Sequence, residues 1–113
     1  MTRDDLLALG RPTPVAVDLP DAGRVHLLPL SLPDLLAAEA EQAAAGDDPQ
    51  ARARWMAGVV TRCVCDEAGN RILEDADADA VLAWPAAALG RLFRAASQMS
   101  AVTPERVEDA AGN

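Results

Sequence analysis

The stretch Val15–Leu27, VAVDLPDAGRVHL, decides the fold of this chain, because its apolar residues alternate with polar ones. Val15, Val17 and Leu19 share one face of an extended chain, and Val25 and Leu27 resume the alternation after a turn at residues 21–23. This pattern predicts a β-hairpin, which we place over residues 15–30. Two strands alone are marginally stable in water. The apolar face of the hairpin must therefore rest on helices or join strands from another copy of the chain.

Helix signals stand on both sides of the hairpin. Thr2 can cap a short helix, with Asp5 completing a capping box and Gly10 taking a left-handed, terminating conformation. After the hairpin, Ser31 is expected to cap a second helix, which Gly46 closes. The apolar stripe predicted for this second helix consists of Leu32, Leu35, Leu36, Ala40 and Ala43.

The two strongest amphipathic helices come later in the chain. The first begins after Asp48 and has an apolar half formed by Trp55, Met56, Val59, Val60, Cys63 and Val64. The second lies within residues 85–99 and has its apolar residues at helical spacing: Leu89, Leu92, Phe93, Ala96 and Met99. Because both apolar faces must be buried, we expect these two helices to pack on each other.

Shorter elements connect and follow these helices. The turn DEAGN, residues 66–70, requires a positive φ at Gly69 or Asn70, and RIL after it is expected to be extended. Asp75 is expected to cap a brief helix, and Thr103 a short C-terminal one.

The expected fold class is therefore α+β and mostly α, with an N-terminal β-hairpin followed by a small bundle of four to five helices. A chain of 113 residues fits one domain. Its expected parts are a short helix and connector (1–14), the hairpin (15–30), the helical body (31–102) and a last short helix (103–113).

The charge of the chain restricts its partners. It has 18 Asp and Glu against 10 basic residues, all of them Arg, which gives a formal net charge of −8. This charge repels nucleic-acid backbones and anionic membranes, so neither is expected as a partner. No run of about 18 apolar residues is present, and the start MTRDDLLALG has acids where a signal peptide needs basic residues. We therefore expect a cytoplasmic protein with reduced thiols.

Two stretches have a partial likeness to metal sites. Cys63 and Cys65 would point roughly 200° apart on a helix, and the remaining candidate zinc ligand, His26, lies far away in a strand. Cys63 is therefore expected to be buried in the core, and Cys65 to be a helix-end residue without an assigned role. EDADADA has the acid spacing of a calcium loop, but Ala80 and Ala86 stand where that loop needs Gly and Glu. Because no nucleophile and base are recognisable either, we expect no metal, no cofactor and no enzymatic activity.

The leucine-dense stretch HLLPLSLPDLL, residues 26–36, leaves two interpretations open. Its two prolines block regular strand pairing, so its leucines must be buried inside the domain or against a partner. It is either a connector packed in the core or a strip that binds another protein. We hypothesise that Leu27, Leu28, Leu30 and Leu32, with the hairpin edge, contribute to self-association or to client contact.

The order of these elements resembles the tail assembly chaperones of long-tailed bacteriophages and their prophage relatives. The resemblance covers residues 15–109 and is carried by VAVDLPDAGRVHLLPLS, VVTRCVCDEAGNRIL, EDADADAVLAW and PAAALGRLFRAASQMSAVTPERVED. It depends on patterned apolar positions. In this chain the turn has DAG where many relatives carry a bulky aromatic residue before the glycine.

The resemblance implies a protein that is not an enzyme. Such chaperones bind the long, helical tape-measure protein, keep it soluble, help tail-tube subunits polymerise around it, and leave before the virion matures. They often self-associate and often have a longer form made by ribosomal frameshifting, so this chain would be the short form. The expected partners are thus the tape-measure protein, the tail-tube protein and further copies of the chain, in the cytoplasm of a bacterial host. The alternatives are a structural phage protein, such as a head-tail connector or tail completion subunit, and a small regulator.

Overall fold

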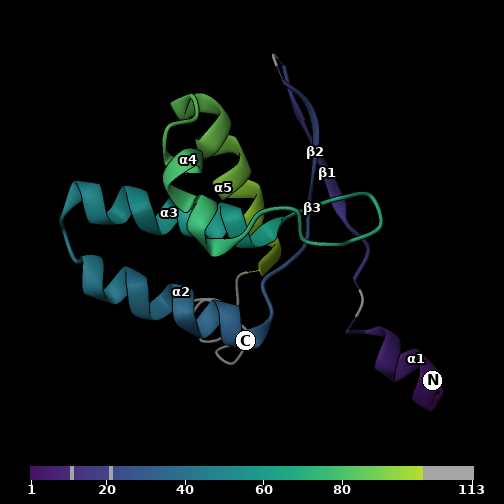
Figure 1. The fold of residues 1–113 in the computed structure, drawn as a ribbon. Helices are drawn as coiled ribbons and strands as arrows, with labels where there is room; N and C mark the ends of the chain where they lie inside the picture. The colour runs from purple at the N-terminus through teal and green to yellow at the C-terminus, as the bar shows by residue number, and fades with distance from the viewer. Residues whose placement is uncertain (11, 21, 101–113) are drawn as a thin grey trace, which may run out of the picture.

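The computed structural model describes residues 1–10, 12–20 and 22–100, and the predicted helix at Thr103 lies outside them. The hairpin stands along one side of a helical body, and the first helix lies beyond the end of the hairpin opposite its turn (Figure 1). The expected fold class is confirmed, because an antiparallel hairpin is followed by a mostly helical chain. The elements are α1 (Arg3–Ala8), β1 (Val15–Leu19), β2 (Gly23–Leu27), α2 (Leu32–Ala45), α3 (Pro49–Cys63), β3 (Val64–Cys65), the 3-10 helix η1 (Asp75–Asp77), α4 (Ala78–Leu82) and α5 (Ala86–Ser100).

Strands β1 and β2 form the predicted hairpin. Val17 lies opposite Val25, so that the alternating apolar residues of the two strands share one face. At the turn, the N–H of Ala22 donates to the carbonyl of Leu19 at 3.2 Å, and Gly23 has a φ of 97°, which glycine adopts without a steric penalty. The second strand ends three residues earlier than expected, and a connector leads from it to α2.

A third strand, which the sequence did not predict, extends the sheet in the order β1-β2-β3. Helix α3 ends at Cys63, and β3 pairs antiparallel with β2, placing Cys65 opposite His26. Arg71 forms a further bridge with Cys65, which agrees with the expected extended segment after the DEAGN turn. Cys65 is therefore a buried strand residue and not the helix-end residue that we expected.

One core joins the sheet to the helices. As predicted, α3 and α5 pack on each other, with the rings of Trp55 and Phe93 arranged edge to face and their centroids 5.0 Å apart. The predicted burial of Cys63 is confirmed. The largest fully buried side chains come from β2, α3, α4 and α5: Leu27, Val60, Thr61, Cys63, Val81 and Leu92.

Helix α2 turns a different face to the core from the one predicted. Its buried residues are Ala38 and Ala45, which lie off the predicted stripe. Leu35 is half-buried, and the rest of the predicted stripe is exposed: Leu32, Leu36, Ala40 and Ala43. The helix is therefore apolar both toward the core and toward the solvent.

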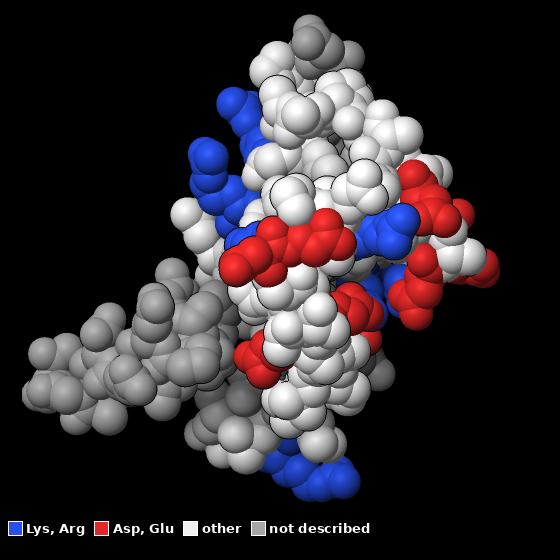
Figure 2. Space-filling model, turned by 90° about the vertical axis from the view of Figure 1, so that its left-hand side faces the viewer, with Lys and Arg blue, Asp and Glu red and all other residues white. Residues whose placement is uncertain are grey.

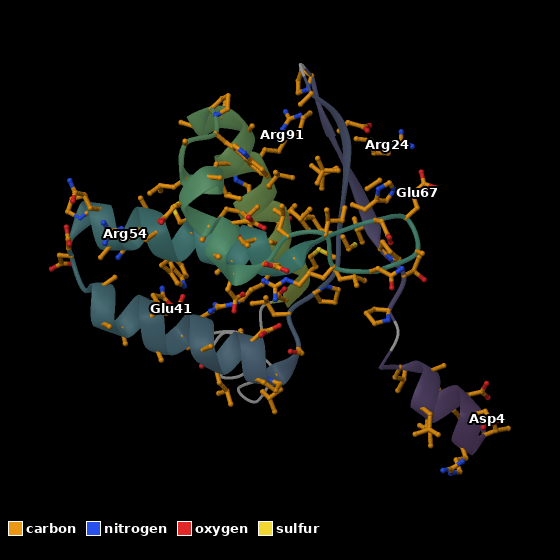
Figure 3. The ribbon with its side chains drawn as sticks, viewed as in Figure 1. Asp4, Arg24, Glu41, Arg54, Glu67 and Arg91 are labelled. Atoms are coloured by element: carbon orange, nitrogen blue, oxygen red, sulfur yellow. The ribbon has the colours of Figure 1, made fainter. Side chains whose placement is uncertain are left out.

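An ion pair and a close helix contact fix this orientation of α2. Nη2 of Arg62 on α3 lies 2.8 Å from Oε1 of Glu41 on α2, and Figure 3 shows Glu41 between the two helices. The Arg62 side chain is mostly buried, and its hydrogen bond with Glu41 raises its pKa. A Cβ on Gly58 would lie 3.5 Å from Oε2 of Glu41, so the helices are close at this point. Turning α2 to bury its leucines would leave the Arg62 charge without its partner, which is costly at a mostly buried site.

Several predicted helix caps are confirmed. The Thr2 hydroxyl accepts the N–H of Asp5 at 3.2 Å, and the Asp5 carboxylate accepts the N–H of Thr2 at 3.0 Å, forming the expected capping box. These hydrogen bonds lower the pKa of Asp5. Ser31, Gly46 and Asp48 also stand at the predicted helix ends.

Two helix ends differ from the prediction. Gly10 does not take the left-handed conformation, and the chain leaves α1 in a helical turn at Leu9. At the acidic segment the cap is Glu74, one residue before the expected Asp75. The Asp77 carboxylate accepts the N–H of Glu74 at 2.8 Å, which satisfies the backbone at this helix end.

Candidate functional site

The sheet places His26 opposite Cys65, so the prediction that this histidine lies far from both thiols is wrong for Cys65. Burial raises the pKa of Cys63 to about 11, against a hydrogen bond with Ser100 that lowers it, and burial also raises the pKa of Cys65. Both side chains are thus protonated at neutral pH, unlike the thiolates that act as nucleophiles or metal ligands. Over the described residues, no three His, Cys, Asp or Glu side chains gather into a metal site.

Asp66 and Asp75, which lie in the DEAGN turn and the EDADADA stretch, have hydrogen-bond or ion-pair partners. Oδ1 of Asp66 accepts the N–H groups of Ala68 and Asn70, each at 2.9 Å, and these hydrogen bonds lower the pKa of Asp66. Gly69 supplies the predicted positive φ of this turn, at 89°. Asp75 pairs with Arg71 at 2.6 Å, which lowers the pKa of Asp75. These contacts explain why acids stand at these positions.

The four leucines of the hypothesised binding strip do not form one surface. Leu27 is fully buried, so it belongs to the core and cannot contact a partner in the folded chain. Leu28 and Leu30 are half-buried in the connector, where the N–H of Leu28 donates to the carbonyl of Cys63 at 2.9 Å. Only Leu32 is exposed. The core-connector interpretation therefore describes the first three leucines, and Leu32 belongs to a different surface.

That surface is the outer face of α2, which we define by Leu32, Leu36, Ala40 and Ala43. Leu32 is 66% exposed and Leu36 is 56% exposed. At 100° per residue the four side chains fall within a quarter of the helix circumference. Figure 2, which views the molecule from the left-hand side of Figure 1, shows acidic and basic side chains among larger areas of uncharged surface. Of these four residues, the hypothesis drawn from the sequence included only Leu32 in a binding strip, because it followed the leucines of the connector and not the outer face of the helix.

Helix α1 is a second apolar element, and no described residue of the chain buries it. None of its residues is buried, and Leu6, Leu7 and Leu9 are all more than half exposed. Figure 3 shows α1, with Asp4 labelled, standing apart from the helical body. Isolated helices shorter than about 12 residues are marginal in water, and α1 has 6 residues. Its leucines and its short length both favour binding to another surface.

A groove, here called the hairpin groove, lies between the turn of the hairpin and the start of α5. It has a volume of about 840 Å³, and its lining includes Leu19, Val25, Trp84, Pro85, Arg91 and Arg94. Nη1 of Arg91 reaches across from α5 and donates to the carbonyl oxygen of Asp18 on β1 at 2.9 Å. The groove is thus apolar, with two arginines on its α5 side.

A second hollow, of about 550 Å³, lies between α2, α3 and the segment η1–α4. Its lining includes the paired side chains Glu41 and Arg62 and the indole of Trp55. The Nε1 atom of Trp55 is buried without a hydrogen-bond partner among the described residues.

No family model, curated protein or solved structure matches this chain. Within the described part of the chain, every helix is too short or too polar to cross a lipid bilayer. The function must therefore be inferred from the surfaces described above.

Proposed function

We propose that this protein is a tail assembly chaperone, which binds the tape-measure protein of a long-tailed bacteriophage, keeps it soluble and promotes assembly of the tail tube around it. The observation that carries the proposal is the outer face of α2. It refines the hypothesis drawn from the sequence, because it retains Leu32 and replaces the other three leucines with Leu36, Ala40 and Ala43.

The outer face of α2 has the chemistry of a helix-binding surface. A helix face that carries leucines is normally buried, but this one is exposed while another face of α2 packs on the core. Burying an exposed leucine side chain contributes about 1.5–3 kcal/mol, so Leu32 and Leu36 can supply useful binding energy. Ala40 and Ala43 have small side chains, which let the backbone of a second helix approach closely. An amphipathic client helix can therefore lie along α2 and cover its own apolar stripe.

The acidic charge of the chain serves the same purpose. A client with long apolar stripes aggregates unless those stripes are covered, and a covering protein must itself remain soluble. The net charge of −8 favours the solubility of this chain, because like-charged molecules repel one another. A contact confined to one face of one helix is also small enough to be reversible, as a chaperone that leaves the assembled tail requires.

Co-expression with the tape-measure protein tests this function. The proposal predicts that the tape-measure protein is soluble and intact when this chain is present, and that it aggregates or is degraded when the chain is absent. A tape-measure protein that is equally soluble and intact in both cases would contradict the proposal. Finding the chain in purified virions would favour the alternative, a structural component such as a connector or completion subunit.

A further inference from the structure

We propose that the hairpin groove binds helix α1 of a second copy of the chain, so that copies associate by exchanging their N-terminal helices. This inference is independent of client binding, because neither α1 nor the groove includes the outer face of α2.

The groove offers an apolar floor of the right kind for leucine side chains. Leu19 and Val25 come from the hairpin, and Trp84 and Pro85 come from the segment before α5. A volume of about 840 Å³ can hold several leucine side chains. The leucines of α1 are not buried by any described residue of their own chain, and they supply such a group on one short helix.

The groove carries cations that can pair with carboxylates of α1. The hydrogen bond to Asp18 holds the Arg91 guanidinium at the groove, and Figure 3 shows Arg91 between α5 and the hairpin. A guanidinium has five N–H donors, so Arg91 keeps donors for a ligand. Arg94 is exposed and forms no ion pair with any described residue. These two cations can pair with the carboxylates of Asp4 and Asp5, which stand between Arg3 and the leucines of α1.

The geometry of the chain assigns the groove to the α1 of another copy. The groove lies beside the hairpin turn, where Pro20 and Ala22 line it. Helix α1 lies beyond the opposite end of the hairpin (Figure 1). A second copy can bring its α1 to the groove without any rearrangement of the fold. Reciprocal exchange closes a dimer, and one-way exchange builds longer chains.

Two variants designed to weaken self-association provide the test. Their molar mass is measured by light scattering over a range of concentrations. Leu6→Asp/Leu7→Asp removes the apolar side of α1, and Arg94→Glu reverses the free charge of the groove. All three residues are exposed, so neither variant should disturb the fold. The wild-type chain is expected to form an oligomer, and each variant is expected to associate at least about tenfold more weakly.

Mixing the two variants makes the test specific. The Leu6→Asp/Leu7→Asp chain keeps an intact groove, and the Arg94→Glu chain keeps an intact α1. In the mixture, the α1 of the Arg94→Glu chain can therefore dock in the groove of the Leu6→Asp/Leu7→Asp chain. A tagged Arg94→Glu chain is expected to capture the untagged Leu6→Asp/Leu7→Asp chain more strongly than either variant captures itself. Leu36→Asp and Arg54→Glu are matched controls on other surfaces and should keep the wild-type mass.

A wild-type chain that stays monomeric at every concentration would overturn the inference, as would variants with the wild-type mass or a mixture without capture. The result is separable from the proposed function. An oligomer that depends on α1 and the groove but binds no tape-measure protein would uphold this inference and contradict the chaperone function.

Discussion

The N–H of Leu30 donates a hydrogen bond to Oγ of Ser100 at 2.8 Å, which ties the connector before α2 to the last residue of α5. Ser100 also hydrogen-bonds with the thiol of Cys63 at the end of α3. Helices α3 and α5 and the connector before α2 thus meet around one hydroxyl group. Together with the Arg62–Glu41 ion pair, this contact positions α2 and so determines which of its faces is exposed.

Replacing Ser100 with alanine should destabilise the fold. The N–H of Leu30 is partly buried and would lose its acceptor, which costs about 1–2 kcal/mol. Urea unfolding measures the change, and Ser97→Ala in the same helix is the matched control, expected to stay within about 0.5 kcal/mol of the wild type. Equal stability of the two variants would show that the hydrogen bond does not hold α2 in place.

The stability of the protein should fall as the pH rises from about 9 to about 11. Burial raises the pKa of Cys63 from 9.0 to about 11, so in this window the unfolded chain releases a proton that the folded chain keeps. The contribution of the protonated Cys63 thiol to the free energy of unfolding is fully present below pH 9. Between pH 9 and about pH 11 the free energy of unfolding falls by up to about 1.4 kcal/mol per pH unit. Burial of Cys65 acts in the same direction. The sequence contains no Lys and no Tyr, so few other groups titrate in this range.

Unfolding curves at pH 8, 9, 10 and 11 measure this loss. In Cys63→Ala the decline should be smaller, because only Cys65 remains to cause it. A wild-type stability that is flat from pH 9 to pH 11 would mean that the Cys63 thiol is not buried as described.

Two glycine-to-alanine substitutions should have opposite effects. Gly90 lies inside α5 with no atom within 4 Å of an added Cβ, so Gly90→Ala should stabilise the protein by about 0.5–1 kcal/mol. Gly23 has a φ of 97° at the hairpin turn, so Gly23→Ala should destabilise it by about 1 kcal/mol or more. Thermal unfolding compares the two, and a stabilising Gly23→Ala would rule out the left-handed turn.

The longer elements of the fold could be predicted from the sequence because their apolar patterns repeat over many residues. The hairpin and the packing of α3 on α5 belong to this group. Strand β3 could not be predicted, since Val64 and Cys65 continue the helical pattern of α3 and two residues establish no period of their own. Their pairing with β2 is a tertiary contact that only the folded chain provides.

The candidate site was predicted only in part, and the reason lies in α2. The apolar stripe predicted for α2 contains its leucines, whereas the residues of α2 that are buried in the core are Ala38 and Ala45. These alanines allow α2 to lie close to α3, and Arg62 holds it there through Glu41. Neither the close approach nor the ion pair is visible in the local sequence. The available signal in the sequence was that α2 has apolar residues on more than one face. This signal indicates an exposed apolar face that includes Leu36 as well as Leu32.

Capture of the tape-measure protein by the outer face of α2 is the central claim, and a quantitative pull-down with matched variants tests it most directly. Immobilised Leu32→Asp/Leu36→Asp is predicted to retain less than about a tenth of the tape-measure protein that the wild type retains, because two leucines lose about 1.5–3 kcal/mol of burial each. Ile72→Asp replaces a side chain that is 59% exposed on another surface and should retain the wild-type amount. If the double variant, shown by urea unfolding to be folded, captures as much tape-measure protein as the wild type, the outer face of α2 is not the client-binding surface.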